Sequence, residues 1–352
     1  MQQAVLFASI ILLLLSSASA QPEQGRLLQR FQQLDKNSDG KLTPAELTRP
    51  LLFRRLDADS DGVVTLDEVQ KRGAALVAGV AAKSAMAVKR DVAYGKHKDQ
   101  RLDVYSPKKG VKDSPVMVYV HGGAWMRGNK SSVGKKATFF TGRGWILVSV
   151  NYRLVPDGQH PRNVEDVATA LAWVHDHCAE QGGDPNLIFL MGHSAGCHLA
   201  ALVATDGRPL KKAGKSLTIV KGVIGLDTQT YDIPQLMKSA SSSAVYAKVF
   251  TEDESTQRDA SPIHHVQKNK GIPPFLICYS RGMATRLNPA RPEQAKAFCA
   301  ALNSAGVEAE VVDASDRNHG QINQRFGDPK DNKVTGKATE FLKAILGKED
   351  AR

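Results

Sequence analysis

The chain has 352 residues, of which 42% are hydrophobic and 24% are charged. This composition is that of a soluble globular protein, and it excludes general disorder, a fibre and a membrane channel. The formal net charge is +11, but no nucleic-acid-binding motif accompanies it, so we expect no nucleic-acid partner.

The first twenty residues predict a cleavable signal peptide. They carry no charged side chain, are apolar from Ala4 to Leu15, and end in Ser17-Ala18-Ser19-Ala20. The small residues at positions 18 and 20 match the A-x-A pattern of a signal-peptidase site. The apolar run is too short to span a bilayer comfortably, and no later stretch is apolar enough to do so. We therefore expect a secreted or periplasmic protein with a signal peptide over residues 1–20 and no membrane span.

Residues 21–72 contain an internal repeat with a period of 22 residues, and each copy holds an acidic loop of twelve residues. Oxygen-bearing side chains occupy loop positions 1, 3, 5, 9 and 12, and glycine occupies position 6, which is the spacing that binds calcium in EF-hands. A backbone carbonyl supplies position 7. The predicted calcium ligands are Asp35, Asn37, Asp39, Lys41, Thr43 and Glu46 in the first loop, and Asp57, Asp59, Asp61, Val63, Thr65 and Glu68 in the second.

Only residues 47–56 separate these two EF-hand-like loops. Ten residues make about 15 Å of helix, so one helix would have to leave the first loop and lead into the second. We therefore do not expect the usual face-to-face pairing of the loops. The sequence has no Met-rich groove for a target, so we expect two structural calcium ions that stabilise the protein or dock it to a protein partner, which the sequence does not identify.

The segment after the repeat predicts a helical linker over residues 73–89, followed by a main domain over residues 90–348. In the main domain, short β-branched runs alternate with helical patterns. This alternation predicts an α/β fold, a doubly wound and mostly parallel sheet, behind the small all-α EF-hand-like module. The predicted strands are residues 101–105, 116–120, 146–152, 188–191, 219–226, 275–279 and 308–312. The predicted helices are residues 164–180, 195–205, 293–304 and 334–346.

Four cysteines occur in the chain: Cys178, Cys197, Cys278 and Cys299. Export would permit disulfides, but each cysteine lies in a predicted core element without close paired spacing. We expect small buried side chains rather than disulfides or a metal site.

A glycine-rich turn, His121-Gly122-Gly123-Ala124-Trp125, follows the predicted strand 116–120. Acyl transfer creates a tetrahedral oxyanion, which needs N–H donors placed in advance at about 3 Å. The backbone N–H groups of Gly122 and Gly123, together with that of Ala195, are the predicted oxyanion hole.

The segment Gly192-His193-Ser194-Ala195-Gly196 follows the apolar strand over residues 187–191 and opens a helix of small residues. This is the sequence context of a nucleophile elbow, in which small residues flank a serine on a sharp turn. The helix adds a partial positive charge beneath the reacting oxygen. Ser194 is the predicted nucleophile.

The segment Asn318-His319-Gly320 lies between the strand 308–312 and the last helix. His319 is the predicted general base, which would take the proton of Ser194 and pass it to the leaving group. Six other histidines are expected to have structural, packing or surface roles: His160, His175, His177, His193, His264 and His265.

These motifs resemble the α/β-hydrolase superfamily over residues 91–346, and within it the carboxylesterase, acetylxylan/feruloyl esterase and kynurenine-formamidase-like group. The resemblance is carried by Tyr94-Gly95, Leu102-Asp103-Val104-Tyr105, HGGAW at 121–125, Val150-Asn151-Tyr152-Arg153-Leu154, Gly183-Asp184-Pro185, GHSAG at 192–196 and NHGQIN at 318–323. It implies a serine hydrolase that needs neither a metal nor an organic cofactor for its chemistry.

The resemblance also implies an acidic residue after the strand 275–279, but the loop over residues 280–286 contains no carboxylate. Asp227 ends the neighbouring predicted strand and is our candidate for the acid, since adjacent strands of a sheet end side by side. Asp232, Asp313 and Asp316 remain alternatives.

We expect an exported serine esterase that forms an acyl-enzyme. Its substrate would be a small ester or an acylated polysaccharide, for example one with acetyl or feruloyl esters. The same residues would also suit an arylformamidase-like or peptidase-like amide hydrolase. An alternative of another class is a calcium-dependent binding protein with a degenerate hydrolase fold, which the missing carboxylate favours.

Overall fold

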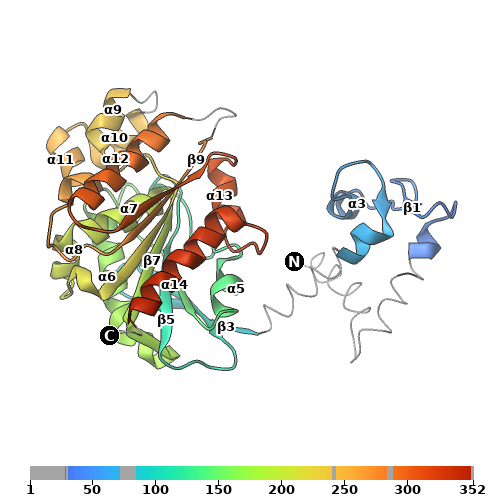
Figure 1. The fold of residues 1–352 in the computed structure, drawn as a ribbon, viewed down its shortest axis with the longest axis horizontal. Helices are drawn as coiled ribbons and strands as arrows, with labels where there is room; N and C mark the ends of the chain where they lie inside the picture. The colour runs from blue at the N-terminus through green and yellow to red at the C-terminus, as the bar shows by residue number, and fades with distance from the viewer. Residues whose placement is uncertain (1–27, 29–30, 72–84, 240–242, 284–287, 350–352) are drawn as a thin grey trace. The chain divides into compact units, whose positions relative to one another are not determined.

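The computed structural model describes residue 28 and residues 31–71, 85–239, 243–283 and 288–349. The chain divides into two compact units, Met1–Lys83 and Ser84–Arg352 (Figure 1). The predicted signal peptide lies outside the described residues. None of the described helices is long and apolar enough to cross a membrane.

The first unit is a small helical module built around the two acidic loops. Its regular elements are β1 (Lys41–Leu42), α3 (Pro50–Leu56) and β2 (Val64–Thr65), and residues 31–34 and 66–71 are also helical. Phe31, Leu42, Leu47, Phe53 and Val64 form its hydrophobic core. Each loop therefore contributes an apolar residue to a core that lies between them.

The two loops pair face to face, which corrects the expectation from the sequence. Strands β1 and β2 are antiparallel, with Lys41 opposite Thr65 and Leu42 opposite Val64. The segment between the loops is not one helix: a single turn over residues 44–46 leaves the first loop, and α3 begins afresh at Pro50. Proline favours the first turn of a helix, so two shortened elements fit where one continuous helix would hold the loops apart.

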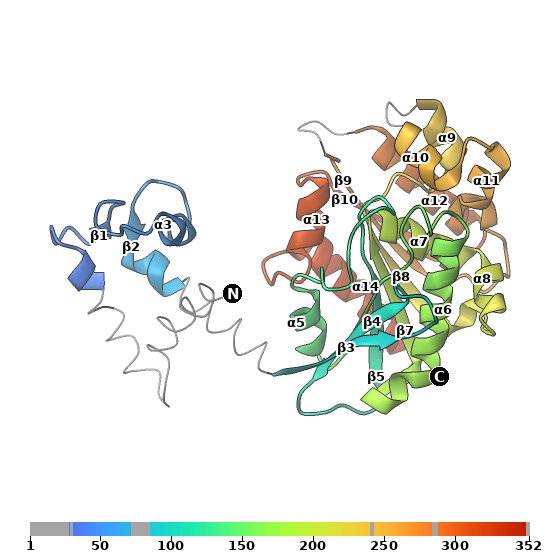
Figure 2. The ribbon, with the colours of Figure 1, turned by 180° about the vertical axis from the view of Figure 1, so that it is seen from behind.

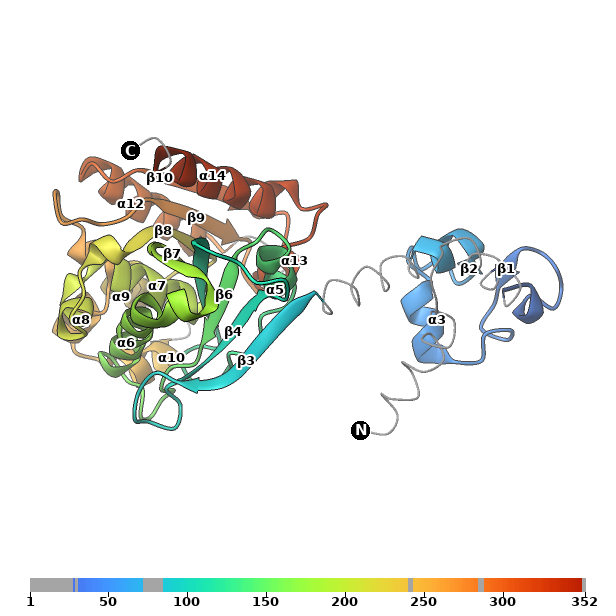
Figure 3. The ribbon, with the colours of Figure 1, turned by 90° about the horizontal axis from the view of Figure 1, so that it is seen from below.

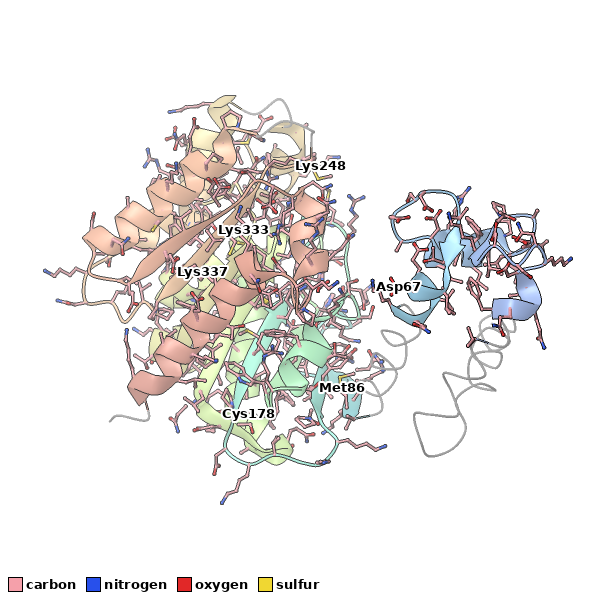
Figure 4. The ribbon with its side chains drawn as sticks, turned by 45° about the vertical axis from the view of Figure 1, so that its right-hand side comes forward. Asp67, Met86, Cys178, Lys248, Lys333 and Lys337 are labelled. Atoms are coloured by element: carbon pink, nitrogen blue, oxygen red, sulfur yellow. The ribbon has the colours of Figure 1, made fainter. Side chains whose placement is uncertain are left out.

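The second unit begins before residue 90, which corrects the predicted linker. Residues 73–84 of that linker lie outside the description, but Met86–Ala93 form strand β3 rather than helix. Met86, labelled in Figure 4, and Val88 alternate on one face and pack against the core. Strand β3 pairs antiparallel with β4 (Arg101–Pro107). This pairing, together with the packing of every second side chain on the core, makes residues 86–89 a strand, although the Ala-rich residues before them favour a helix.

An eight-stranded sheet forms the centre of the second unit, in the order β10-β9-β8-β7-β5-β6-β4-β3. The strands from β10 to β6 are parallel, whereas β4 and β3 at one edge are antiparallel to their neighbours. The remaining strands are β5 (Ser114–Val120), β6 (Ile146–Val150), β7 (Gly183–His193), β8 (Val220–Leu226), β9 (Phe275–Ser280) and β10 (Ala309–Ala314).

Helices cover both faces of this sheet, as Figure 3 shows from below. One face carries α6 (Arg162–His177), α7 (Ala195–Thr205) and α12 (Ala290–Ser304), and the other carries α5 (Lys136–Thr141), α13 (His319–Arg325) and α14 (Lys337–Glu349). Alternate residues of β5 pack on opposite sides: Val118 belongs to the first core and Met117 to the second. Each such fully buried side chain contributes about 1.5–3 kcal/mol. The expected α/β fold class is thereby confirmed.

Four short helices follow β7 and precede β9 in the sequence, and Figure 2 shows them from behind. They are α8 (Gly207–Lys212), α9 (Ile233–Ser239), α10 (Ser243–Phe250) and α11 (Glu254–Asp259), with 3-10 turns at Cys178–Gln181, Leu217–Ile219 and Pro262–His265 and a π-helical turn at Asn332–Gly336 before α14. All four cysteines are free thiols. Three of them are buried, and Cys299 is half-buried.

Candidate active site

Ser194 lies on a sharp turn between β7 and α7. Its backbone has φ 56° and ψ −120°, a region that L-residues rarely adopt and that stores strain at functional sites. A Cβ on Gly192 would lie 2.1 Å from the carbonyl oxygen of Gly196, and a Cβ on Gly196 would lie 2.1 Å from that of Val120. The glycines of the motif are therefore required by the close approach of α7 to the sheet, and the serine is left at the carboxyl end of β7.

A chain of hydrogen bonds links Ser194, His319 and Asp227. The Ser194 Oγ lies 2.9 Å from the Nε2 of His319, and the His319 Nδ1 lies 2.6 Å from the Oδ2 of Asp227. His319 is the first residue of α13, whose start is fixed by a capping box between Asn318 and Gln321. With Nδ1–H donating to the carboxylate, Nε2 is free to accept the proton of the serine.

Asp227 reaches His319 from the end of β8, where the sheet register places it. Leu226 lies opposite Cys278 of β9, so the next residue stands beside the end of that strand, and the Asp227 N–H donates to the Cys278 carbonyl at 2.8 Å. The carboxylate of Asp227 is fully buried. Burial alone would raise the pKa of this carboxyl, but the hydrogen bond with His319 and the positive charge of Arg291 hold it well below the ordinary value.

The other carboxylates considered from the sequence have partners elsewhere. Asp232 lies 3.6 Å from His264, Asp313 accepts from the Ser315 N–H at 2.8 Å, and Asp316 pairs with Arg317 at 3.0 Å. Asp227 is thus the carboxylate that the structure brings to His319.

His193 packs directly against the base. The ring centroids of His193 and His319 are 4.6 Å apart, and the His193 Nε2 donates to the backbone carbonyl of His319 at 2.9 Å. Burial lowers the pKa of His193 to about 3, so this ring stays neutral and holds α13 in place. His160 and His265 both contact Asp259, far along the chain from the nucleophile.

The glycine-rich turn after β5 lies against the nucleophile. A Cβ on Gly122 would lie 2.9 Å from the Cβ of Ser194, so only glycine lets the backbone come this close. Tyr152 supports the turn by donating to the His121 carbonyl at 3.1 Å. The structure thus brings Gly122 next to Ser194, whose chain neighbour is Ala195, while the assignment of Gly122, Gly123 and Ala195 as oxyanion donors stays a prediction.

A basic hollow of about 470 Å³ lies elsewhere in the second unit, and Arg208, Lys211, Lys215 and Lys270 are among the residues that line it. It adjoins α8, which follows the carboxyl end of α7. Ser194 lies at the opposite end of α7, so the hollow is remote from the hydrogen-bonded chain.

Residues 102–283 match the BD-FAE family model, which covers more than half of the chain. The chain belongs to the BD-FAE family. The turn that carries Ser194 between β7 and α7 falls inside the matched segment of this α/β-hydrolase family, whereas His319 lies beyond it.

Curated relatives of this BD-FAE protein are esterases. It is 28% identical over 275 residues to the probable isoprenylcysteine alpha-carbonyl methylesterase ICMEL1 of Arabidopsis thaliana, with 74% of this chain and 56% of the relative covered. It is 33% identical over 228 residues to the esterase LipC of Mycobacterium tuberculosis, with 61% of this chain and 55% of the relative covered. The chain therefore spans little more than half the length of these two relatives. The carboxylesterase NlhH of M. tuberculosis is 30% identical over 267 residues, with 73% of this chain and 82% of the relative covered.

Solved structures with the same fold are also esterases. Esterase B from Lactobacillus rhamnosis, in an inhibited form, superposes with a TM-score of 0.64 at 18% identity, over 81% of this chain and 98% of that chain. At this identity the likeness shows the fold. Thermogutta terrifontis esterase 2, phosphoramylated by tabun, superposes with a TM-score of 0.58 at 26% identity, and the superposition covers 74% of this chain and 95% of that chain.

The acidic loops of the first unit match the EF-hand family model at residues 28–52 and 49–71. In the second loop, the carboxylates of Asp57, Asp59 and Asp61 offer oxygens that all lie within 4.8 Å of one another. The Asp57 Oδ1 is buried and has no hydrogen-bond partner among the described residues, which is costly unless a cation binds there. The residues of this loop therefore fit a hard cation.

The two glutamates at loop position 12 have matching environments. Glu46 accepts from the N–H and hydroxyl of Thr43 at 2.9 and 2.8 Å, and Glu68 accepts from the same groups of Thr65 at 2.8 and 2.9 Å. The hydrogen bonds from Thr43 and Thr65 lower the pKa of the two carboxyls below the ordinary value. Both glutamates are thus ionised and held toward their loops.

Proposed function

We propose that this BD-FAE protein is a serine esterase that hydrolyses carboxylic esters. The observation that carries the proposal is the hydrogen-bonded chain from the Ser194 Oγ through His319 to Asp227. The names of the relatives support an ester as the substrate. A degenerate, non-catalytic hydrolase fold is disfavoured, because Asp227 supplies the carboxylate beside His319 that the loop after β9 lacks.

The first half of the reaction forms an acyl-enzyme. The Ser194 Oγ attacks the ester carbonyl while its proton passes to the Nε2 of His319. Backbone N–H groups of Gly122, Gly123 and Ala195 stabilise the oxyanion that forms, and a donor of this kind contributes about 3–4 kcal/mol. His319 then protonates the departing alcohol.

The second half of the reaction releases the acid. His319 takes a proton from water, which attacks the acyl-enzyme carbonyl, and then returns the proton to the Ser194 Oγ. Asp227 stabilises the imidazolium form of His319 in both halves and keeps Nδ1 protonated. No step requires a metal or an organic cofactor, so calcium has no part in this chemistry.

The proposed natural substrate is an ester carried by a polysaccharide, such as an acetyl or feruloyl ester, and the proposed location is outside the cytoplasm. The apolar segment that ends in the A-x-A pattern supports export. The positive net charge of +11 favours an acidic polymer as a partner.

We further propose that the first unit binds two calcium ions, one in each EF-hand-like loop. The ligands would be the side chains at positions 1, 3, 5, 9 and 12, with the carbonyls of Lys41 and Val63. The buried, unpaired Asp57 Oδ1 supports this proposal. Since the catalytic residues all lie in the second unit, the ions would stabilise the first unit or dock it to a partner.

The esterase proposal is tested by following p-nitrophenol release from p-nitrophenyl acetate. We expect the Ser194→Ala variant to lose the turnover of the mature protein by a factor of about 10⁶, because the covalent intermediate can no longer form. Acetylated and feruloylated polysaccharides, assayed for acid release with the same pair of proteins, report the natural substrate class.

A matched control is Ser131→Ala, which changes an exposed serine on the segment between β5 and α5. This variant should keep the wild-type rate. If Ser194→Ala, folded as judged by circular dichroism, hydrolysed p-nitrophenyl acetate as fast as the control, the esterase proposal would be wrong. If the protein hydrolysed p-nitrophenyl acetate but released no acid from either polysaccharide, the polysaccharide would be rejected as the natural substrate.

A further inference from the structure

Arg291, near the start of α12, is buried against the acid of the site. Its side chain is 7% exposed, and its Nη1 lies 2.7 Å from the Oδ1 of Asp227. The same nitrogen lies 3.4 Å from the Nδ1 of His319. A buried guanidinium is strongly destabilising unless an opposite charge pairs with it, and Asp227 is that partner.

Ser280 occupies the end of β9, where the resemblance to α/β-hydrolases implies the acid. It donates its N–H to the Asp227 Oδ1 at 2.9 Å and its hydroxyl to the Asp227 Oδ2. With Arg291 on Oδ1 and His319 on Oδ2, four donors surround the carboxylate. A carboxylate has about four lone-pair positions, so Asp227 is held from β9, α12 and α13 at once.

Arg291 and Asp227 have opposite effects on the protonated form of His319. A lone carboxylate in hydrogen-bond contact favours the protonated imidazolium, whereas a cation at 3.4 Å disfavours it. The Asp227–Arg291 pair is neutral as a unit. Removing the arginine would therefore expose the base to an uncompensated negative charge in a buried setting, where charges are screened little.

The other titratable groups near His319 contribute less. His193 stays neutral, since burial lowers its pKa to about 3. Lys136 of α5 donates to Asn323 of α13 rather than to His319, and burial lowers its pKa to about 7. On the flanking segments, Arg281 donates to a backbone carbonyl, and Arg317 pairs with Asp331 and Asp316. Among the described residues, Asp227 and Arg291 are thus the charges in direct contact with the base.

We propose that Arg291 is a positioning residue of the triad: it fixes Asp227 at the end of β8 and offsets its charge, so that His319 acts as a base at lower pH than beside an unshielded carboxylate. The inference rests on the proposed esterase function. It accounts for a triad acid that stands one strand away from the usual place, because Ser280 and Arg291 together provide the donors that hold it there.

The test is the pH dependence of kcat/KM for p-nitrophenyl acetate in the full chain. Arg291→Gln removes the charge, Arg291→Lys keeps it, and Lys296→Gln is the matched control, since it makes the same charge change at an exposed position on the same helix. We expect the acidic limb of the profile to move up by about one pH unit in Arg291→Gln. The limb should stay near the wild-type position in Arg291→Lys and in Lys296→Gln.

A second comparison does not depend on the folding of Arg291→Gln. Asp227→Asn keeps the arginine without its partner, and Asp227→Asn/Arg291→Gln replaces the ion pair by two amides, a change that buried pairs often tolerate. In these two variants the ionisation of His319 is followed by the pH dependence of its imidazole NMR signals rather than by turnover. The midpoint should lie about one pH unit lower in the single variant, because the arginine alone repels the imidazolium.

Coincident acidic limbs in the first comparison, or coincident His319 midpoints in the second, within about 0.2 pH units, would overturn the role of Arg291. Equal displacement in Arg291→Lys and Arg291→Gln would also overturn it, because the effect would then not follow the charge. Ser194-dependent turnover is measured on the plateau of the wild-type profile. Its absence would reject the esterase function and this inference together, whereas its presence with unmoved limbs would reject this inference alone.

Discussion

The Asp227 carboxylate is fully buried and still ionised, because each of its oxygens accepts from two donors. A buried charge without such partners would neutralise by taking up a proton. Asp227 also has φ 61°, a left-handed conformation that Asp tolerates better than most residues. Its position is therefore set by backbone, donors and charge together.

Replacing Asp227 by Asn tests the acid directly. An amide at this position can donate to Nδ1 of His319 and so stabilises the wrong tautomer, which leaves no acceptor for the Ser194 proton. We expect kcat for p-nitrophenyl acetate to fall by about 10³- to 10⁴-fold with KM little changed. Asp232→Asn is the control and should change kcat by less than about twofold; an equal loss in both variants would contradict the assignment.

Among the residues of the site, those that belong to a local motif could be predicted from the sequence. Ser194 and His319 stand in short segments whose neighbours are constrained by a sharp turn and a helix start. Asp227 follows from a weaker argument, the adjacency of two strand ends. Arg291 carries no sequence signal, since it lies outside any motif and meets Asp227 only because α12 packs beside the ends of β8 and β9.

Helix α7 approaches β5 so closely that its first turn has no room for a side chain at residue 196. The Cβ of an alanine there would lie 2.1 Å from the Val120 carbonyl and 2.6 Å from that of His121. His121 also begins the turn that carries the predicted oxyanion donors. Packing of one helix on one strand thus sets both the stability of the sheet and the geometry around Ser194.

Gly196→Ala should therefore lower stability and activity together. We expect about 3 kcal/mol less free energy of unfolding, since overpacking against backbone cannot relax by a rotamer change, and a fall in kcat. Gly347→Ala on α14 is the control: nothing lies within 4 Å of its added Cβ, so it should raise stability by about 0.5–1 kcal/mol. Urea unfolding measures the free energy of unfolding of both variants, and the ester assay measures kcat. Equal changes in the free energy of unfolding would contradict the close packing of α7 on β5 as the cause.

Most of the seven strands expected from the sequence contain apolar, β-branched runs, as parallel strands buried on both faces require, whereas β4 and β10 include Asp103 and Glu310. Strand β3 escaped the prediction because it lies at the edge of the sheet and contains Lys89, Arg90 and Asp91 around a register shift. The short helices α5 and α13 escaped because two turns give too little periodicity to recognise.

The proposed calcium ligands and the proposed catalytic residues lie in different units of the chain. The loops that fit calcium lie in Met1–Lys83, whereas Ser194, His319 and Asp227 lie in Ser84–Arg352. The small core of the first unit holds only five buried apolar side chains among the described residues. Modules of this size commonly need a metal or another cross-link for stability.

Removal of calcium should therefore unfold the first unit before the second. At free calcium about a hundredfold above the dissociation constant, each ion should stabilise its unit by about 2.7 kcal/mol. Calorimetry should show a transition that a chelator shifts to lower temperature and that Glu46→Gln/Glu68→Gln makes insensitive to calcium, while kcat/KM of the esterase stays constant. Identical melting curves with calcium and with chelator would contradict the structural role.

The state of the cysteines bears on how the whole molecule matures. None of the four thiols is bridged, and burial raises the pKa of Cys178 to about 11 and that of Cys197 to about 12, so the reactive thiolate is scarce. In an oxidising compartment the folded protein should therefore keep these two buried thiols reduced, because the protonated thiol is a poor nucleophile.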